Sequence, residues 1–298
     1  MNKHFLLNKK TIEDSIYTEG IGIHSGDSIK MRFLPANKNT GIVFINKRYG
    51  MKSPIRSSPE SVSDTTYAIT LSNNKWQIQT VEHLLSVFYI LGITDIIIET
   101  CGNEIPIFDG SSLPIINLFN EKKFYLFEEI NNPIKIINPI WIINGDKFII
   151  ALPSKVPSIS YTISYNHPIL HSQYANFTIS KDTYIKEIAK ARTFGFEKDV
   201  EFLRMSSYAR GGSLKNALVL SESSYLNKPR FSNECVRHKI MDFIGDIALI
   251  GKPILGKFIV CKSGHTLDFS FIKKIINIYS NIDVGEKIDF QRKVRKKI

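Results

Sequence analysis

The chain is poor in cysteine, with only Cys101, Cys235 and Cys261 among its 298 residues. An odd and sparse set of cysteines argues against a disulfide framework and fits a reducing compartment. The sequence also lacks any apolar run near the roughly 18 residues that a membrane span needs. Its first ten residues show neither the apolar region nor the small-residue cleavage site of a signal peptide. We therefore expect a globular protein of the cytoplasm.

Negative charge is scarce relative to positive charge. Asp and Glu number 28 against 39 Lys and Arg, so the net charge is +11 and the isoelectric point is about 9.4. Such an excess predicts attraction to nucleic acid, to an anionic membrane or to a phosphorylated substrate, but it predicts no fold. Because no RNP, KH or zinc-finger pattern is present, we expect no nucleic-acid partner. The densest basic cluster, residues 292–297, is interpreted as a frayed end whose alternative role is transient contact with the anionic inner-membrane surface.

One order of elements occurs twice along the chain. It consists of a helix, a glycine, an apolar strand, a glycine-containing turn and a second helix. The helix, strand and helix are expected at residues 81–91, 95–99 and 114–120, and again at residues 233–250, 257–261 and 267–279. This duplication predicts an α+β fold of two similar domains, residues 1–128 and 133–298, each a β-sheet layered on helices. A site between the two domains would then bring their helices together.

The segment around residues 237–246 carries a metal-binding pattern. His238, Asp242 and Asp246 recur at four-residue steps, and residues four apart lie about 6 Å from each other on one helical face. His238 and Asp242 can bind one ion together, and His83 offers a third ligand beside the free carboxylate of Glu82. Two His, one Asp and a nearby Glu are typical of a hydrolytic zinc site that keeps a position open for water. We expect one Zn²⁺ per chain, although iron suits the same donors.

Simpler interpretations exist for some of these residues. Glu82 and His83 would also suit the exposed first turn of a helix whose N-cap is Thr80. The spacing of Cys235 and His238 would also suit a zinc pair, but no second pair completes such a site. A buried thiol is therefore the preferred interpretation of Cys235.

His265 follows an apolar strand, where a catalytic acid is often placed. Asp246 lies on the predicted metal helix, and pairing with it would favour the cationic form of His265. A cationic imidazole facing the metal would stabilise an oxyanion and protonate an amine leaving group. The alternative is that His265 is a structural residue of the turn without a catalytic role.

Several blocks along the chain together identify a family resemblance. They are Gly20 to Gly26, Thr80 to Leu85, Glu104 to Ser111, Asn166 to Pro168, Ala191 to Phe196, Gly211 to Ser213, Arg237 to Asp246 and Lys262 to His265. With all of these in order, the chain resembles the UDP-3-O-acyl-N-acetylglucosamine deacetylases, zinc amidases of lipid A biosynthesis in Gram-negative bacteria. The resemblance implies two α+β domains of like topology, each with a small insert.

The resemblance also implies roles for individual residues. His83, His238 and Asp242 match the zinc ligands, Glu82 the general base and His265 the general acid or oxyanion stabiliser. The remaining matches are Asp246 supporting His265, Thr193 on the tetrahedral intermediate, Lys239 and Lys262 near the sugar and diphosphate, and Tyr165, Phe194 and Lys147 at the nucleotide end. The insert around residues 194–219 matches an apolar passage for an acyl chain, lined by Phe196, Phe202, Leu203 and Met205. The alternative for these four is an ordinary helix core.

The implied reaction is hydrolysis of the N-acetyl group of UDP-3-O-[(3R)-3-hydroxyacyl]-N-acetylglucosamine. Its products are UDP-3-O-acyl-glucosamine and acetate, and the reaction is the committed step of lipid A biosynthesis. The alternative is a zinc amidohydrolase for another acylated amino sugar. The sequence contains nothing that demands oligomerisation, so we expect a monomer.

Overall fold

The computed structural model describes residues 8–279, which form helices and several β-sheets. His4 and the basic cluster at residues 292–297 lie outside the described residues. Among residues 8–279, no helix combines the length and the apolar character that crossing a membrane requires.

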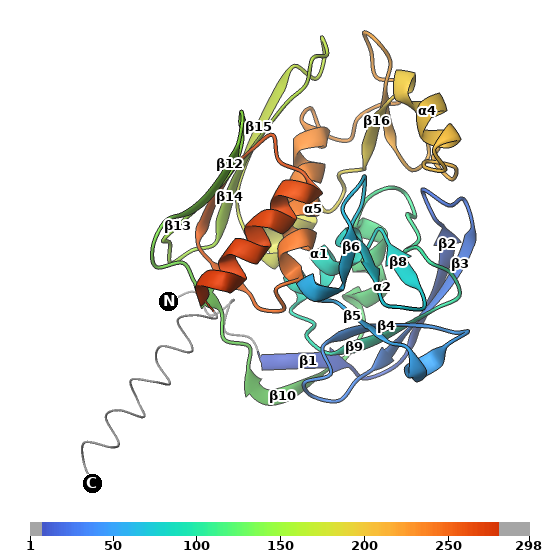
Figure 1. The fold of residues 1–298 in the computed structure, drawn as a ribbon, viewed down its shortest axis with the longest axis vertical. Helices are drawn as coiled ribbons and strands as arrows, with labels where there is room; N and C mark the ends of the chain where they lie inside the picture. The colour runs from blue at the N-terminus through green and yellow to red at the C-terminus, as the bar shows by residue number, and fades with distance from the viewer. Residues whose placement is uncertain (1–7, 280–298) are drawn as a thin grey trace.

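Two five-stranded sheets form the framework, and they share one topology (Figure 1). The first has the order β2 (Ile16–Ile21), β3 (Ser28–Pro35), β9 (Ile96–Thr100), β4 (Ile42–Asn46) and β5 (Ile55–Arg56). The second has the order β12 (Ile140–Asn144), β13 (Lys147–Leu152), β19 (Lys257–Cys261), β14 (Ser158–Ser164) and β15 (Ser172–Thr178). In each sheet the last strand along the chain is central, antiparallel to one neighbour and parallel to the other. The predicted α+β fold of two similar halves is therefore confirmed.

A cluster of phenylalanine rings lies in each of the two cores. Phe33 of β3 packs edge-on against Phe88 and Phe119, which lie on α1 (Glu82–Leu91) and α2 (Leu113–Asn120). In the second half, Phe258 of β19 contacts Phe243 and Phe271 in the same way. Phe243 belongs to α5 (Glu234–Ala248), and Phe271 to the helix at residues 265–279. Each of these rings is almost completely buried and contributes roughly 1.5–3 kcal/mol.

The helices α1 and α5 pack against each other between the two sheets, as Figure 1 shows. Gly92 ends α1 in the left-handed conformation, with φ of 71°, which is why glycine suits this position. Gly245 of α5 lies so close to α1 that a Cβ there would be 2.1 Å from the carbonyl oxygen of Glu82. The absence of a side chain at Gly245 thus permits the close approach of the two helices.

Smaller elements connect and extend the two halves. Two short strand pairs lie on either side of residues 131–133. The first joins β1 (Asn8–Ile12) to β10 (Phe124–Ile130), and the second joins β11 (Ile134–Lys135) to β18 (Ile254–Leu255). The first half inserts β6 (Val62–Asp64), β7 (Thr70–Ser72) and β8 (Gln77–Gln79), and the second inserts β16 (Phe194–Phe196), α4 (Val200–Met205) and β17 (Leu218–Leu220). Short helical segments complete the order: 3-10 turns at Gly50–Lys52, Pro59–Ser61 and Glu197–Asp199, α3 (Lys181–Thr183) and a π-helix at Tyr184–Ile188. The domain limits at residues 128 and 133 remain predictions.

Candidate active site

The three predicted metal ligands meet where α1 packs against α5. One ligand atom from each of His83, His238 and Asp242 lies within 4.8 Å of the other two. Asp242 Oδ1 is 3.2 Å from His238 Nε2 and 3.8 Å from His83 Nε2. All three residues are buried. Two imidazole nitrogens and a carboxylate oxygen facing one point can hold a divalent metal ion.

The environment keeps both imidazoles neutral, which is the form that binds metal. Burial, followed by the neighbouring His238, lowers the pKa of His83 to about 3. Burial likewise lowers the pKa of His238, whose Nδ1 lies 3.2 Å from the carbonyl oxygen of Ala191. That contact directs Nε2 of His238 toward Asp242. Burial would raise the pKa of Asp242, but the surrounding groups, with His238 foremost and Lys239 next, lower it on balance.

The start of α1 is held by a buried carboxylate that the sequence analysis did not single out. Glu104 accepts hydrogen bonds from the backbone nitrogens of His24 and Ser25 and from the hydroxyl of Thr80. Thr80 itself has a positive φ of 62°, and it does not cap the helix, because the N-cap is Val81 without a side-chain bond. The interpretation of Thr80 as N-cap is therefore wrong. The block around Glu104 was noted in the sequence, but only the fold brings it to the start of α1.

Glu82 is buried beside the metal ligands and is not part of an exposed helical turn. Its side chain accepts a hydrogen bond of 3.0 Å from the backbone nitrogen of Ile69. Burial is the largest influence on this carboxyl and raises its pKa to about 7; the charge of His265 opposes that rise. A carboxyl with a pKa near neutrality can both accept and release a proton.

His265 is bonded to Asp246, and a second carboxyl lies behind the pair. His265 Nδ1 is 2.8 Å from Asp246 Oδ2, and both residues are buried. Asp268 joins them, since one ligand atom from each of the three residues lies within 4.8 Å of the others. The helix begins at His265, two residues earlier than the sequence predicted, so His265 and Asp268 share one helical face. The sequence analysis predicted that this helix starts at residue 267. The three-residue helical spacing of His265 and Asp268 was therefore not recognised, and Asp268 was missed.

Lys239 and the aromatic residues form a wall next to the ligands. The ammonium of Lys239 is 2.9 Å from Asp242 Oδ2. Burial opposes its charge, but Asp242 raises the pKa of Lys239 well above its usual value. The ring of Phe194 contacts the rings of His238 and Tyr165, and Tyr165 also contacts Phe196.

A cavity of about 680 Å³ opens from His265 toward the second sheet. Tyr165, Lys147 and Lys262 line it together with His265. Lys262 also forms an ion pair with Asp146 at the rim. The structure therefore brings two predicted basic residues and one predicted aromatic residue to one cavity beside the metal ligands.

Thr193 lies between the two halves of the molecule. Its backbone nitrogen donates a 2.8 Å hydrogen bond to the carbonyl oxygen of Gly110, and its own carbonyl accepts one from Leu218. Thr193 is half-buried and directly precedes β16. Its backbone is thus fixed by both halves.

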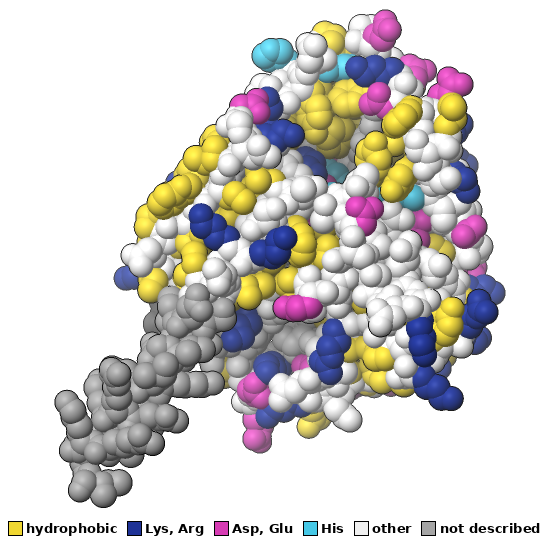
Figure 2. All heavy atoms as spheres, viewed as in Figure 1, with side chains coloured by type: hydrophobic (Ala, Val, Ile, Leu, Met, Phe, Trp, Pro, Cys, Tyr) yellow, Lys and Arg dark blue, Asp and Glu magenta, His cyan; other side chains and the backbone are white. Residues whose placement is uncertain are grey.

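The insert of the second half exposes apolar side chains. Phe202 and Met205 of α4 are 63% and 80% exposed, and no residue of this helix is buried. An ordinary helix core is therefore excluded for these two residues. Figure 2 shows hydrophobic side chains around a hollow between the two projecting parts of the molecule, which in Figure 1 are the second sheet and the insert. This placement is compatible with an apolar passage.

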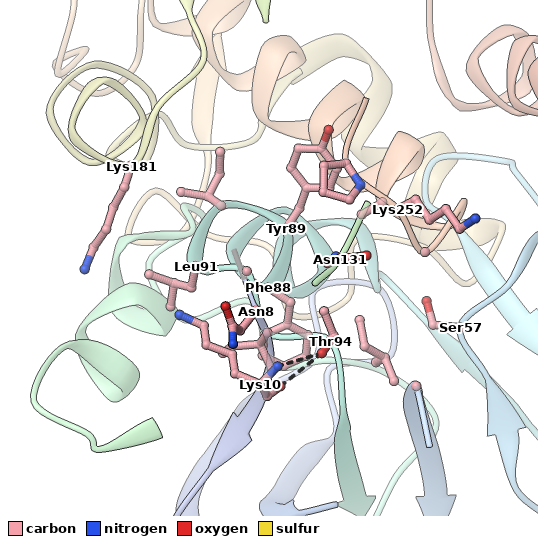
Figure 3. A pocket seen from close by; sticks show the side chains of 18 of the residues that line it. Asn8, Lys10, Ser57, Phe88, Tyr89, Leu91, Thr94, Asn131, Lys181 and Lys252 are labelled. Atoms are coloured by element: carbon pink, nitrogen blue, oxygen red, sulfur yellow. Dashed lines mark hydrogen bonds between the residues drawn. The ribbon is translucent and has the colours of Figure 1, made fainter. Parts of the chain in front are cut away.

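Another cavity, of about 370 Å³, lies at the opposite ends of α1 and α5 (Figure 3). Phe88, Leu91, Lys10 and Lys181 are among the residues that line it. It contains none of the predicted site residues. The shape of a cavity is therefore not enough to identify the candidate active site. The cluster of titratable side chains identifies it.

Comparison with known proteins adds an independent finding. A family model described as UDP-3-O-acyl N-acetylglycosamine deacetylase matches residues 9–277. Proteins named UDP-3-O-acyl-N-acetylglucosamine deacetylase are similar along most of the chain. The one from Leptospira biflexa is 43% identical over 274 residues, which is 91% of each chain. Those from Syntrophus aciditrophicus and Helicobacter pylori are 39% and 37% identical, covering 92% and 93% of this chain and 87% and 94% of their own.

Proposed function

The chain belongs to the UDP-3-O-acyl-N-acetylglucosamine deacetylase family, and we propose that it hydrolyses the N-acetyl group of the UDP-linked acylated amino sugar with the residues gathered at α1 and α5. The products are UDP-3-O-acyl-glucosamine and acetate. The observation that carries the residue assignment is the convergence of His83, His238 and Asp242 beside Glu82 and His265. Membership of the family supports the reaction; the buried geometry supports the individual roles.

His83, His238 and Asp242 would hold one Zn²⁺. The donor set fits this ion, because zinc sites of hydrolases combine imidazole nitrogens with a carboxylate and have three protein ligands. When bound, zinc acidifies a water molecule and polarises a carbonyl group. Iron(II) accepts the same two-His, one-carboxylate set, so the identity of the metal is part of the proposal.

Glu82 takes the proton from the attacking water. Its carboxyl is held by the amide of Ile69, and its pKa of about 7 suits a group that must bind and release a proton at neutral pH. The water oxygen adds to the carbonyl carbon of the acetamido group. The C–N bond then breaks and releases acetate together with the free amine of the sugar.

His265 supplies the proton that the departing amine needs. Asp246 accepts a hydrogen bond from Nδ1 of the cationic imidazole, which leaves the Nε2 proton for the substrate. In our assignment, the Thr193 hydroxyl and the His265 imidazole stabilise the negative charge that develops on the carbonyl oxygen, and the Lys239 ammonium lies near the sugar and diphosphate.

The cavity beside His265 would take the sugar nucleotide. Lys147 and Lys262 place positive charge along it, Tyr165 provides an aromatic face, and a diphosphate is anionic. The exposed apolar residues of the insert, together with Phe194 and Phe196, would take the acyl chain. We further propose a monomeric cytoplasmic enzyme that touches the anionic inner-membrane surface only transiently.

The test is the variant Glu82→Gln in protein stripped of metal and then titrated with zinc. Glutamine keeps an acceptor for the Ile69 amide but cannot take a proton, so turnover should fall about 10²–10⁴-fold. Metal binding should persist at one equivalent. The matched control is Glu121→Gln, which changes an exposed carboxylate at the end of α2 and should leave turnover unchanged.

Two outcomes would contradict the proposal in different ways. Near-wild-type turnover of Glu82→Gln would remove Glu82 as the base while keeping the reaction. The second outcome is a folded wild-type protein that binds zinc but does not hydrolyse the UDP-linked substrate. If this protein hydrolyses a nucleotide-free acylated amino sugar, the alternative substrate is favoured.

A further inference from the structure

Two buried carboxyl groups meet behind His265, and each has one oxygen without a partner. Asp246 and Asp268 are both fully buried. Asp246 uses Oδ2 for His265, and Asp268 uses Oδ1 to accept a hydrogen bond from the hydroxyl of Ser263. Among the described residues, no donor reaches Asp246 Oδ1 or Asp268 Oδ2. The two free oxygens belong to neighbouring residues of one cluster.

Such a pair is unstable if both carboxyls are ionised. A buried acceptor without a donor keeps its desolvation penalty, and two adjacent carboxylates repel each other. A single proton held between them removes both costs, because it gives each free oxygen a hydrogen-bond partner. Burial raises the pKa of each carboxyl well above its usual value, and the charge of the neighbouring Asp246 raises the pKa of Asp268 further.

The surroundings decide which carboxyl keeps the proton. Asp246 accepts a hydrogen bond from His265, which favours its ionised form. In the described part of the chain, Asp268 accepts its hydrogen bond from a neutral donor, the hydroxyl of Ser263. Other titratable groups that act on the pair are Lys239 and Asp242 on α5, Glu82 on α1 and Tyr161 on β14. Lys239 is already paired with Asp242.

We propose that Asp268 is protonated in the folded enzyme and donates its hydrogen bond to the free oxygen of Asp246, which keeps Asp246 ionised and oriented as the acceptor for His265. Asp268 is thus a positioning residue: it acts on the substrate only through Asp246 and His265. The inference rests on the proposed function for its effect on turnover, but the shared proton itself does not.

The variants Asp268→Asn and Asp268→Ala separate this role from a merely structural one. An asparagine carbonyl can still accept the Ser263 hydroxyl, and its amide can still donate to Asp246, so Asp268→Asn should keep turnover within about threefold of wild type. Asp268→Ala removes the donor, and the loss of such a supporting hydrogen bond is expected to lower kcat about 10–100-fold with little change in KM. Thermal unfolding of both variants checks that each is folded.

The pH profile supplies a second distinction. Without the donor, Asp246 itself takes up the proton, and His265 loses the anion that favours its cationic form. The basic limb of the kcat profile of Asp268→Ala should therefore shift to lower pH. A residue that only packed the helix would lower kcat without moving this limb.

A measurement that needs no substrate tests the proton directly. Because Glu82 is itself partly protonated near pH 7, the spectra are recorded on zinc-loaded Glu82→Gln protein. At pH 7 they should contain the carbonyl stretch of a protonated carboxyl that disappears when Asp268→Asn is added. Its absence in Glu82→Gln, or its persistence once Asp268→Asn is added, overturns the inference whatever the substrate proves to be. Equal kcat profiles for Asp268→Ala and wild type would overturn it as well. If the infrared band is present and no deacetylase activity is found, the proposed function fails and the shared proton stands.

Discussion

The close approach of α1 and α5 makes Gly245→Ala the sharpest structural test of the site. A Cβ at residue 245 would lie 2.1 Å from the carbonyl oxygen of Glu82 and 2.7 Å from its carbonyl carbon. The obstacle is backbone, so no flexible side chain can turn aside. Because packed interiors leave little free space, the helices must separate by roughly 1 Å to restore an ordinary contact.

The expected change in stability is opposite to the change that the same substitution would cause in an isolated helix. Within a helix, Ala is favoured over Gly by about 1 kcal/mol, whereas overpacking costs about 1–3 kcal/mol and the clash here is with backbone. We expect net destabilisation. Each kcal/mol of unfolding free energy that is lost should lower the melting temperature by roughly 2–4 °C. His83 moves with α1 while His238 and Asp242 move with α5, so the metal should also bind at least about tenfold more weakly, which corresponds to about 1.4 kcal/mol.

Thermal unfolding and competition with a metal chelator measure the two effects. The matched control is Gly195→Ala, because a Cβ at Gly195 meets nothing within 4 Å. If Gly245→Ala were as stable as wild type and bound metal equally well, the close contact of the two helices and its role in placing His83 would both be refuted.

Two further predictions concern buried groups near the start of α5. Arg192→Met should destabilise the protein by about 3–5 kcal/mol, seen as a lower denaturant midpoint, because it leaves the buried carboxylate of Glu234 without the guanidinium that bonds it at 2.9 and 3.2 Å. Burial raises the pKa of Cys235 to about 12, so alkylation at pH 8 followed by mass spectrometry should modify exposed Cys101 and spare Cys235 until the protein is unfolded. Rapid modification of native Cys235 would show that α5 opens at its start.

Elements with a strong local pattern were predictable from the sequence. The strand at residues 257–261 was predicted with the bounds that β19 has, and the helix ending before Gly92 was predicted to within one residue. In both cases a run of apolar residues ends at a local signal, and neighbouring residues determine the outcome. The pairing of His238 with Asp242 was equally accessible, because a four-residue step on a helix places two side chains together whatever surrounds them.

Short paired strands were not predictable in this way. The sheet of β6, β7 and β8 has strands of three residues, and β1 pairs with β10 more than a hundred residues later. Such segments are too short to show a period, and they are stabilised by partners that the local sequence does not identify. The π-helix at Tyr184–Ile188 likewise lacks a local signal. It packs against α5, and the hydroxyl of Tyr184 bonds Ser86 of α1 and Ser112 at the start of α2.

The sequence by itself determined which residues could bind a metal and that two similar halves would form. It did so because helical spacing and the repeated order of elements are local properties of the chain. Only the tertiary structure decided that Glu82 is buried, that Gly245 lets α1 reach α5, and that Asp268 stands behind Asp246. These depend on contacts between residues far apart in sequence, and burial in such contacts raises the pKa of Glu82 and Asp268.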